Sequence, residues 1–418
     1  MPSPDRAGLD LNWIRPQFPS LALVENGHPA AYFDGPGGTQ VPQQVIDAIA
    51  DYLTRSNSNT HGLFPTSRRS DETVLAAHQA AADLLNCDFR EIVFGANMTS
   101  LTFAVSRAIA RDLSPGDEIV LTYLDHDANF SPWKALEEKG VVIRVADFRP
   151  DDCTLDTDAL LSLINEKTKL VAVGYASNAV GSINQVQRIA RAARDAGALS
   201  FIDAVHYAPH GPIDVQEIGC DFLACSAYKF FGPHQGILYG KREHLERLKP
   251  YKVRPAEEAL PGRWETGTQN HEAMAGVTAA IDYLAEFGRH HGVTKSSRRE
   301  TLNAAMSLIQ QAERALFERL ATGLLAVPGL TFYGIRDPQQ FDRRAPTAAV
   351  RVEGHTPQQI AQRLGEQGLF VWDGNFYALN FHERLDLEPS GGTVRIGLAH
   401  YNTPEEVDRL LTALNNLD

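Results

Sequence analysis

Short apolar runs alternate with amphipathic helical stretches through the middle of this 418-residue chain. The expected strands cover residues 91–94, 118–123, 141–145, 169–175, 199–202 and 221–225. The expected helices between them cover residues 101–109, 129–139, 155–166 and 186–196. Strands that are apolar throughout and separated by helices are typical of a parallel sheet buried on both faces. The chain is therefore predicted to be an α/β protein, with residues 236–239 as an antiparallel strand, because the preceding loop is too short for a crossover helix.

The pattern changes after about residue 270. Long helical stretches are expected at residues 272–287 and 297–326, followed by strands at 330–333, 348–352, 369–372 and 393–399. Two further helices begin at Thr356-Pro357 and Thr403-Pro404, where a capping threonine precedes a proline suited to the first turn. We expect an N-terminal segment (1–32) that packs on the small domain, a large domain (33–289) and a smaller C-terminal α+β domain (290–418).

Charge and composition narrow the class of protein. Lys plus Arg total 39 and Asp plus Glu total 52, a net charge of −13, which argues against nucleic acid as a partner. No apolar run approaches the ~20 residues of a membrane span, and the first residues lack the pattern of a signal peptide. Four cysteines in this length, Cys87, Cys153, Cys220 and Cys225, are typical of a reduced protein. We expect a cytoplasmic protein that binds no membrane.

Polar side chains follow five of the expected strands. They lie in residues 95–100, 125–129, 177–178, 203–206 and 226–229. Each set alone has an ordinary explanation as a helix cap, a turn or a solvated side chain. However, ligands of open parallel sheets bind at the carboxyl ends of the strands, so five such ends predict one binding site.

The residue types at these strand ends suit one cofactor. A lysine such as Lys229 can form a Schiff base with an aldehyde, and an aspartate such as Asp203 can keep a pyridine nitrogen protonated. The helix that follows residues 95–100 can bind a phosphate at its N-terminus. Together these are the requirements of pyridoxal 5′-phosphate (PLP).

The chain also resembles a known family, the fold-type I PLP enzymes of the class V aminotransferase and cysteine desulfurase-like group. The resemblance runs over residues 33–414. Its strongest segments are 125–129 (DHDAN), 177–181 (SNAVG), 201–206 (FIDAVH), 226–233 (SAYKFFGP), 264–268 (WETGT) and 394–403 (VRIGLAHYNT). Six matching segments in the same order and at compatible spacing identify this family far more specifically than a single motif would. The resemblance implies a large domain with a mostly parallel seven-stranded sheet between helices, and a smaller α+β domain.

The resemblance also implies roles for individual residues. Lys229 would form the internal aldimine and move the Cα proton, Asp203 would pair with the pyridinium nitrogen, and His126 would stack on the ring. The remaining implied cofactor contacts are Met98, Thr99, Ser226 and Tyr228 at the phosphate, and Asn178 and His206 near the phenolic oxygen or the substrate carboxylate. Tyr228 stands where many relatives have histidine.

Substrate and subunit contacts follow in the same way. Arg395 would bind the substrate α-carboxylate as a bidentate fork. Asn178 would lie beside that carboxylate, and Gly35, in a glycine-rich stretch without the G-x-G-x-x-G spacing, would line the substrate entrance. Thr268 would reach the phosphate of a second subunit, which implies a homodimer with shared sites. His61 lies where relatives place active-site residues from the partner subunit, with a solvated loop as the alternative.

The chain departs from the cysteine desulfurases at one essential group. Their persulfide-forming cysteine should fall near residues 374–378, and no cysteine occurs after Cys225. We therefore expect no persulfide transfer. Cys220 and Cys225 are interpreted as core thiols, since a C-x4-C spacing is not a zinc signature. His206 and His210 lie on a strand exit rather than on one helix face, so no metal site is expected.

The preferred hypothesis is a PLP-dependent lyase that acts on an α-amino acid by β-elimination of a carbon–sulfur or carbon–selenium bond. An aminotransferase, an epimerase, or a decarboxylative or carbon–carbon bond-forming enzyme of secondary metabolism remain alternatives. A non-catalytic PLP-binding protein is a further alternative, although Lys229 and Asp203 are both present. The sequence does not select the amino acid, because Tyr377, Phe376, His234 and Arg263 form no recognisable code.

Overall fold

The computed structural model describes residues 8–417 and is built around a seven-stranded sheet. Its strands are, in spatial order, β4 (Ile92–Gly95), β12 (Gly236–Gly240), β11 (Phe222–Ser226), β10 (Leu199–Asp203), β9 (Thr168–Gly174), β5 (Glu118–Thr122) and β6 (Val142–Ala146). All neighbours are parallel except β12, which is antiparallel to both β11 and β4. The predicted parallel sheet and the predicted antiparallel strand are thus confirmed.

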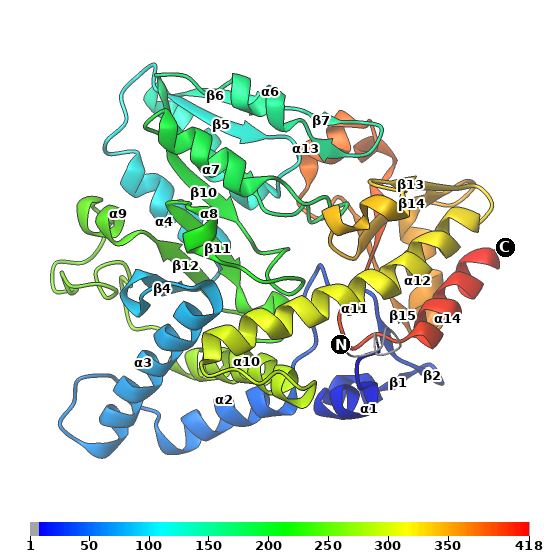
Figure 1. Cartoon of the computed structure of the whole chain (residues 1–418), viewed down its shortest axis with the longest axis horizontal. Coiled ribbons are helices and arrows are strands. Elements are labelled where there is room, and N and C mark those ends of the chain that lie inside the picture. The colour runs from blue at the N-terminus through cyan, green and yellow to red at the C-terminus, as the bar shows by residue number, and fades with distance from the viewer. Residues whose placement is uncertain (1–7, 418) are drawn as a thin grey trace.

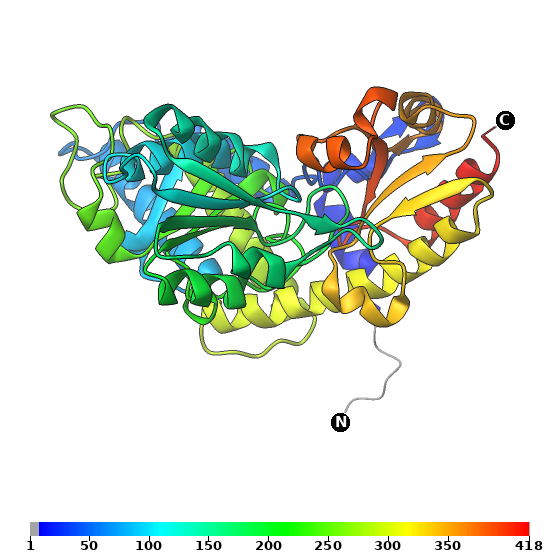
Figure 2. The same cartoon turned by 90° about the horizontal axis from the view of Figure 1, so that it is seen from above.

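Helices cover both faces of this sheet (Figure 2). Successive strand residues point to opposite faces, so Ile202 packs into one apolar cluster and Phe201 into another. The helices of this part are α2 (Gln43–Arg55), α3 (Pro65–Leu85), α4 (Met98–Ile109), α5 (Ser131–Lys134), α6 (Thr157–Ser162), α7 (Val186–Asp195), α8 (Val215–Ile218), α9 (Arg242–Arg247) and α10 (His271–His290). Burial on both faces explains why these strands are apolar at every position.

A second, four-stranded sheet forms the other end of the molecule (Figure 1). Its order is β13 (Leu330–Tyr333), β14 (Thr347–Val352), β17 (Thr393–Gly397) and β16 (Trp372–Gly374), all antiparallel. The helices here are α12 (Pro357–Glu366), α13 (Leu379–Arg384) and α14 (Pro404–Asn415). The long helix α11 (Arg298–Ala326) packs on α3 and α10 at one end and on β13 and α14 at the other, so it joins the two halves.

The N-terminal part lies against this second sheet. The strand β3 (Ala31–Tyr32) pairs in parallel with β15 (Leu369–Phe370). Residues 1–7 of the predicted N-terminal segment lie outside the described residues. The remaining short elements are α1 (Leu11–Ile14), β1 (Val24–Glu25), β2 (His28–Pro29), β7 (Phe148–Arg149) and β8 (Thr154–Leu155).

Two predicted elements differ from the structure. The helix expected at residues 129–139 is broken into a 3-10 turn (Asp127–Asn129), α5 and a second 3-10 turn (Ala135–Lys139), because Pro132 has no N–H to continue a helical ladder. The strand expected at residues 369–372 is divided between β15 and β16, since its two ends pair with different partners. Within residues 8–417, no helix combines the length and the apolar character that crossing a bilayer requires.

One glycine lets the sheet approach the helix that begins at the site. A Cβ built on Gly236 of β12 would lie 2.8 Å or less from three backbone atoms of Asn97, the residue that caps α4. We predict that Gly236→Ala lowers the free energy of unfolding by about 1–3 kcal/mol, because backbone atoms cannot yield as a side chain can.

Gly365→Ala is the matched control. Gly365 lies in α12, and a Cβ there would meet no atom within 4 Å, so alanine should be neutral or stabilising. Thermal unfolding of both variants measures the difference. Equal melting temperatures would contradict the close approach of β12 to α4.

Candidate active site

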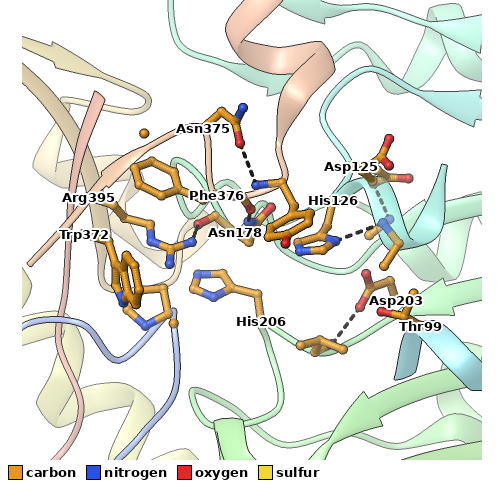
Figure 3. Close-up of a pocket in the computed structure, with 18 of the residues that line it drawn as sticks. Thr99, Asp125, His126, Asn178, Asp203, His206, Trp372, Asn375, Phe376 and Arg395 are labelled. Carbon is orange, nitrogen blue, oxygen red and sulfur yellow. Dashed lines mark hydrogen bonds between the residues drawn. The ribbon is translucent and has the colours of Figure 1, made fainter. Parts of the chain in front are cut away.

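A cavity of about 1690 Å³ opens at the carboxyl ends of β5, β9, β10 and β11, between the two sheets. Residues of the second sheet and its loops line the opposite wall, among them Arg395 of β17 (Figure 3). Ten of the residues predicted for the site line this cavity. They are Met98, Thr99, His126, Asn178, Asp203, His206, Ser226, Tyr228, Lys229 and Arg395.

Lys229 and Asp203 form the floor of the cavity. Burial and the charge of Arg395 lower the pKa of Lys229 to about 7, although the carboxylates of Asp203 and Asp34 oppose this shift. The Lys229 Nζ donates a hydrogen bond to the Pro36 carbonyl oxygen. An amine with such a pKa is partly neutral near pH 7, which is the form that attacks an aldehyde.

Asp203 is the last residue of β10. Its Oδ1 accepts a hydrogen bond of 2.9 Å from the Val205 N–H. Burial raises its pKa to about 6, while the Val205 N–H and the charge of Lys229 act in the opposite direction. A protonated heterocyclic nitrogen placed against this carboxylate would favour its charged form.

His126 follows β5 and presents a neutral ring to the cavity. Burial, together with the charges of Lys229 and Arg395, lowers its pKa to about 3. Its Nδ1 accepts a hydrogen bond of 3.0 Å from the Ala128 N–H, so the proton of the neutral ring lies on Nε2. The Tyr377 ring stacks on it with centroids 5.4 Å apart. A neutral, oriented imidazole is suited to stacking on a planar ring.

The adjacent Asp125 ties two strand ends together. Its Oδ1 accepts a hydrogen bond of 2.6 Å from the Gly174 N–H at the end of β9, and its Oδ2 accepts one of 3.2 Å from Asn129 Nδ2. Burial raises the pKa of this carboxyl well above its usual range. The sequence segment 125–129 was noted, but no role for Asp125 was predicted.

The N-terminus of α4 forms the end of the cavity that suits an anion. The Met98 N–H donates a 3.1 Å hydrogen bond to Ser226 Oγ, and Asn97 Oδ1 caps the Ser100 N–H at 2.9 Å. Thr99 lies in the same first turn and lines the cavity. Backbone N–H groups, hydroxyls and the helix dipole together favour a phosphate here.

Arg395 and Asn178 meet on the opposite wall. Arg395 Nη1 donates a 3.0 Å hydrogen bond to the Asn178 carbonyl oxygen, and the guanidinium lies 4.3 Å from the centroid of the Phe376 ring. Asn178 Nδ2 donates a 2.8 Å hydrogen bond to the Phe376 carbonyl oxygen. Within the described part of the chain, Arg395 Nε and Asn178 Oδ1 are buried without a partner. Because unpaired buried polar atoms are costly, both are suited to bind a polar ligand.

His206 lies next to a second buried pair, His210 and Glu313. Its Nε2 lies 3.1 Å from Thr347 Oγ1, and its ring lies 5.4 Å from that of His210. His210 Nδ1 in turn lies 2.8 Å from Glu313 Oε2. Burial and the neighbouring His210 lower the pKa of His206 well below its usual value, so its ring is neutral.

Three predicted residues do not line the cavity of their own chain. His61 is exposed, with its ring near Asp71 and Glu257, and Thr268 is also exposed. Gly35 is buried against the Leu398 carbonyl group, whereas its neighbours Pro36 and Gly37 line the cavity. The prediction for Gly35 is therefore wrong by one residue, because Pro36 is the residue that reaches the cavity.

Sequence reasoning assigned Arg395 of the small domain to the site, but it gave no role to Asp34 or to the residues that follow. Asp34 is half-buried, its Oδ1 is buried and unpartnered among residues 8–417, and burial raises its pKa to about 6. Trp372, Asp373, Asn375 and Glu388 line the outer wall. No local pattern could have placed these loops at the carboxyl ends of distant strands.

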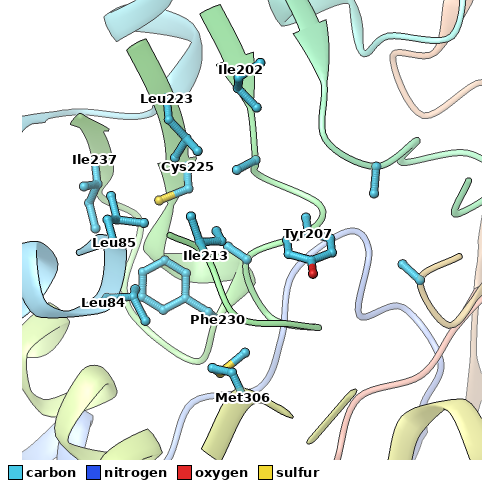
Figure 4. Packing of buried hydrophobic residues seen from close by; sticks show 14 of the residues in the cluster. Leu84, Leu85, Ile202, Tyr207, Ile213, Leu223, Cys225, Phe230, Ile237 and Met306 are labelled. Atoms are coloured by element: carbon cyan, nitrogen blue, oxygen red, sulfur yellow. The ribbon is translucent and has the colours of Figure 1, made fainter. Parts of the chain in front are cut away.

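All four cysteines lie in the described part of the chain, and none lines the cavity. Cys225 comes nearest in sequence to Lys229, but it is fully buried beside Phe230 and Ile237 (Figure 4). Burial, with the charge of Asp203, raises the pKa of its thiol to about 12. Burial likewise raises the pKa of Cys153 to about 12. Neither thiol is activated as a nucleophile.

Known proteins show the same architecture. The profile of the family described as "Aminotransferase class-V" matches residues 31–410. A cysteine desulfurase of Pectobacterium atrosepticum is 31% identical over 421 residues, covering 97% of each chain. A probable cysteine desulfurase of Synechocystis is 32% identical over 417 residues, covering 96% of this chain and 94% of the relative.

Solved structures agree with this match. The apo structure of a cysteine desulfurase from Thermococcus onnurineus superposes with a TM-score of 0.86 at 26% identity, covering 97% of both chains. A cysteine desulfurase from Escherichia coli gives a TM-score of 0.83 at 27% identity, covering 98% of both chains. The predicted fold type I, with its α/β large domain, is confirmed. The chain therefore belongs to the class V aminotransferase family and is an enzyme that depends on pyridoxal 5′-phosphate.

Proposed function

We propose that this enzyme is a lyase that releases sulfur or selenium from an α-amino acid by β-elimination, without a persulfide on the protein. The observation that carries the proposal is a cavity with a lysine, an aspartate and a buried arginine but with no cysteine among its lining residues. Its relatives are named for the removal of sulfur from cysteine. An enzyme that keeps carbon–sulfur lyase chemistry but has no thiol to accept the sulfur releases that sulfur by direct elimination.

The residues of the cavity fit PLP. Lys229 would hold the aldehyde carbon, Asp203 the pyridine nitrogen, and His126 one face of the ring. The phosphate would lie at the N-terminus of α4, near Met98, Thr99, Ser226 and Tyr228. The unpartnered Oδ1 of Asn178 and the neutral ring of His206 would lie near the phenolic oxygen. Bound PLP supplies an electron sink for the electrons released at Cα.

The chain's own residues supply binding and proton transfer. Arg395 binds the α-carboxylate, and its unpartnered Nε explains why a buried guanidinium is retained there. The Lys229 amine, with a pKa near 7, takes the proton from Cα. The thiol or selenol then leaves from Cβ. For a sulfur substrate, the amino acid and one water molecule give a thiol, pyruvate and ammonia.

Asp203→Asn tests the proposed contact with the ring nitrogen. An amide carries no negative charge to stabilise the protonated ring, so we predict at least a hundredfold loss in kcat, about 2.7 kcal/mol of barrier. The cofactor should still bind, and its visible absorbance measures this. Asp386→Asn, an exposed position at φ 55° where asparagine is tolerated, is the control. A rate within a few fold of the parent would contradict the role of Asp203.

Replacing all four cysteines by serine or alanine tests the absence of a persulfide. We predict that turnover stays within a few fold of the parent, because none of these thiols lines the cavity. Any sulfur released from L-cysteine should appear as free sulfide, with equal amounts of pyruvate and ammonia. A persulfide mechanism would give two different results. The parent would form alanine from L-cysteine, and replacing one particular cysteine would abolish the release of sulfur.

A panel of amino acids separates the alternative reactions. Keto acid formed with transfer of the amino group indicates an aminotransferase, and carbon dioxide indicates decarboxylation. A change of configuration at Cα indicates an epimerase. Binding of PLP without any product over the whole panel would favour a non-catalytic protein.

We also propose that the enzyme is a homodimer with shared sites. His61 and Thr268 are exposed and lie outside the cavity of their own chain. Beside His61, Leu63 is 92% exposed and Phe64 is 51% exposed, an apolar pair that a second copy would cover. In this arrangement Thr268 completes the phosphate site of the other subunit.

The solution mass tests this arrangement. We predict a mass twice the 45.9 kDa of the chain, and weaker retention of PLP in Thr268→Ala without a change in mass. Both are measured by light scattering and by the cofactor content after dialysis. A fully active monomer would contradict the proposal.

A further inference from the structure

The mouth of the cavity carries three carboxylates from three separate elements. Asp127 belongs to the 3-10 turn after β5, Asp373 to β16 and Glu388 to the 3-10 turn before β17. All three are partly buried. Over residues 8–417, none of them forms an ion pair with a lysine, arginine or histidine. Arg351, the nearby arginine, is directed instead to Ser390 and Gly392.

Hydrogen bonds fix the segment around these groups. Asn375 Nδ2 donates to Glu388 Oε1 at 2.9 Å, and the Tyr377 N–H donates to Asn375 Oδ1 at 3.1 Å. The Asp127 N–H donates to the Tyr377 carbonyl oxygen at 2.7 Å. Glu388 and Asp127 are thus tied to residues 375–377, and Asp373 lies two residues before Asn375. The carboxylates are held at one mouth.

The lysine and the arginine that line the cavity have carboxylates near them, unlike the three groups at the mouth, which have no cation beside them in the described part of the chain. Lys229 and Arg395 are balanced by Asp203 and Asp34, which shift their pKa values. Arg395 is 5% exposed and Asn178 is 9% exposed, and each has a buried polar atom without a partner in the described chain. Figure 3 shows both side chains directed into the cavity. Arg395 and Asn178 can therefore bind a polar ligand, while the carboxylates at the mouth have no ion-pair partner among residues 8–417.

The cavity is also large for a small substrate. Its volume of about 1690 Å³ exceeds the roughly 300–1,000 Å³ of ordinary small-molecule sites. The exposed rings of Trp372 and Tyr377 lie at the same mouth, and aromatic faces attract cations. An amino acid whose side chain carries no positive charge would leave the carboxylates at the mouth without a cation.

We propose that the substrate is an α-amino acid whose extended side chain ends in a positively charged group. Its α-carboxylate binds Arg395, and its distal cation lies among Asp127, Asp373 and Glu388. This inference rests on the proposed function, because it assumes that the cavity is the substrate site of a lyase acting at Cβ.

Three thioethers of L-cysteine, nearly matched in length, test the charge preference on the PLP-loaded enzyme. S-(2-aminoethyl)-L-cysteine ends in a cation, S-propyl-L-cysteine is neutral, and S-carboxymethyl-L-cysteine ends in an anion. Each Kd is measured from the change in visible absorbance of the cofactor. We expect the cationic compound to bind about tenfold or more tightly than the anionic one at low salt, with the neutral one between, and the ratio to shrink as salt screens the charges.

The double variant Asp373→Asn/Glu388→Gln assigns the preference to the mouth. It should bring the Kd ratio of cationic and anionic compounds to within about threefold while leaving the Kd of the neutral compound unchanged. Glu383→Gln, an exposed position of α13 outside the cavity lining, should leave the ratio unchanged. Equal binding of the anionic compound by the parent, or an unchanged ratio in the double variant, overturns the proposal.

The same experiment separates the two proposals. If the cationic compound binds preferentially but yields no thiol, pyruvate or ammonia, the β-elimination is wrong and the charge preference stands. If all three compounds are eliminated with the same kcat/KM and the same Kd, the lyase function stands and the charge preference is wrong.

Discussion

The structure depends on two cations that meet at one cavity, the half-buried Lys229 and the buried Arg395. Lys229 follows β11 of the large sheet and Arg395 belongs to β17 of the small one. The charge of Arg395 lowers the pKa of Lys229, and both charges lower the pKa of His126. Burying both is costly unless carboxylates accompany them, and Asp203 and Asp34 do so. The cavity lies where the two sheets bring Lys229 and Arg395 together, with Asp203 and Asp34 as their charged neighbours.

The segment around Asp34 makes that meeting possible. Asp34 bridges to Gly397 at the end of β17, while the Pro36 carbonyl accepts a hydrogen bond from Lys229. Three residues later, the Thr39 N–H donates to the Tyr228 carbonyl oxygen at 3.0 Å. One short stretch thus contacts both the arginine strand and the lysine turn. A displacement there would move the carboxylate-binding group relative to the reactive amine.

The outer wall bears on the reaction that we propose. Phe376 and Tyr377 both adopt positive φ angles, of 54° and 57°, and their rings lie on Arg395 and His126. Backbone strain of this kind persists only where the surroundings hold it. The segment in which relatives would carry a sulfur-accepting cysteine is here a fixed, aromatic and acid-flanked wall, which fits release of sulfur to solution and binding of a longer side chain.

The sequence by itself determined the floor of the cavity, which the large domain forms. The apolar strands, the polar residues that follow them and the lysine at 229 are local patterns, and parallel strands bring their ends to one edge whatever the rest of the chain does. The antiparallel β12 also followed from a loop length. Tertiary structure alone decided that Trp372, Asp373 and Glu388 reach the same cavity. It also decided that Pro36 and Gly37, rather than Gly35, face it. Those positions depend on how two sheets pack across long sequence separations, and no periodicity or spacing in the chain records that packing.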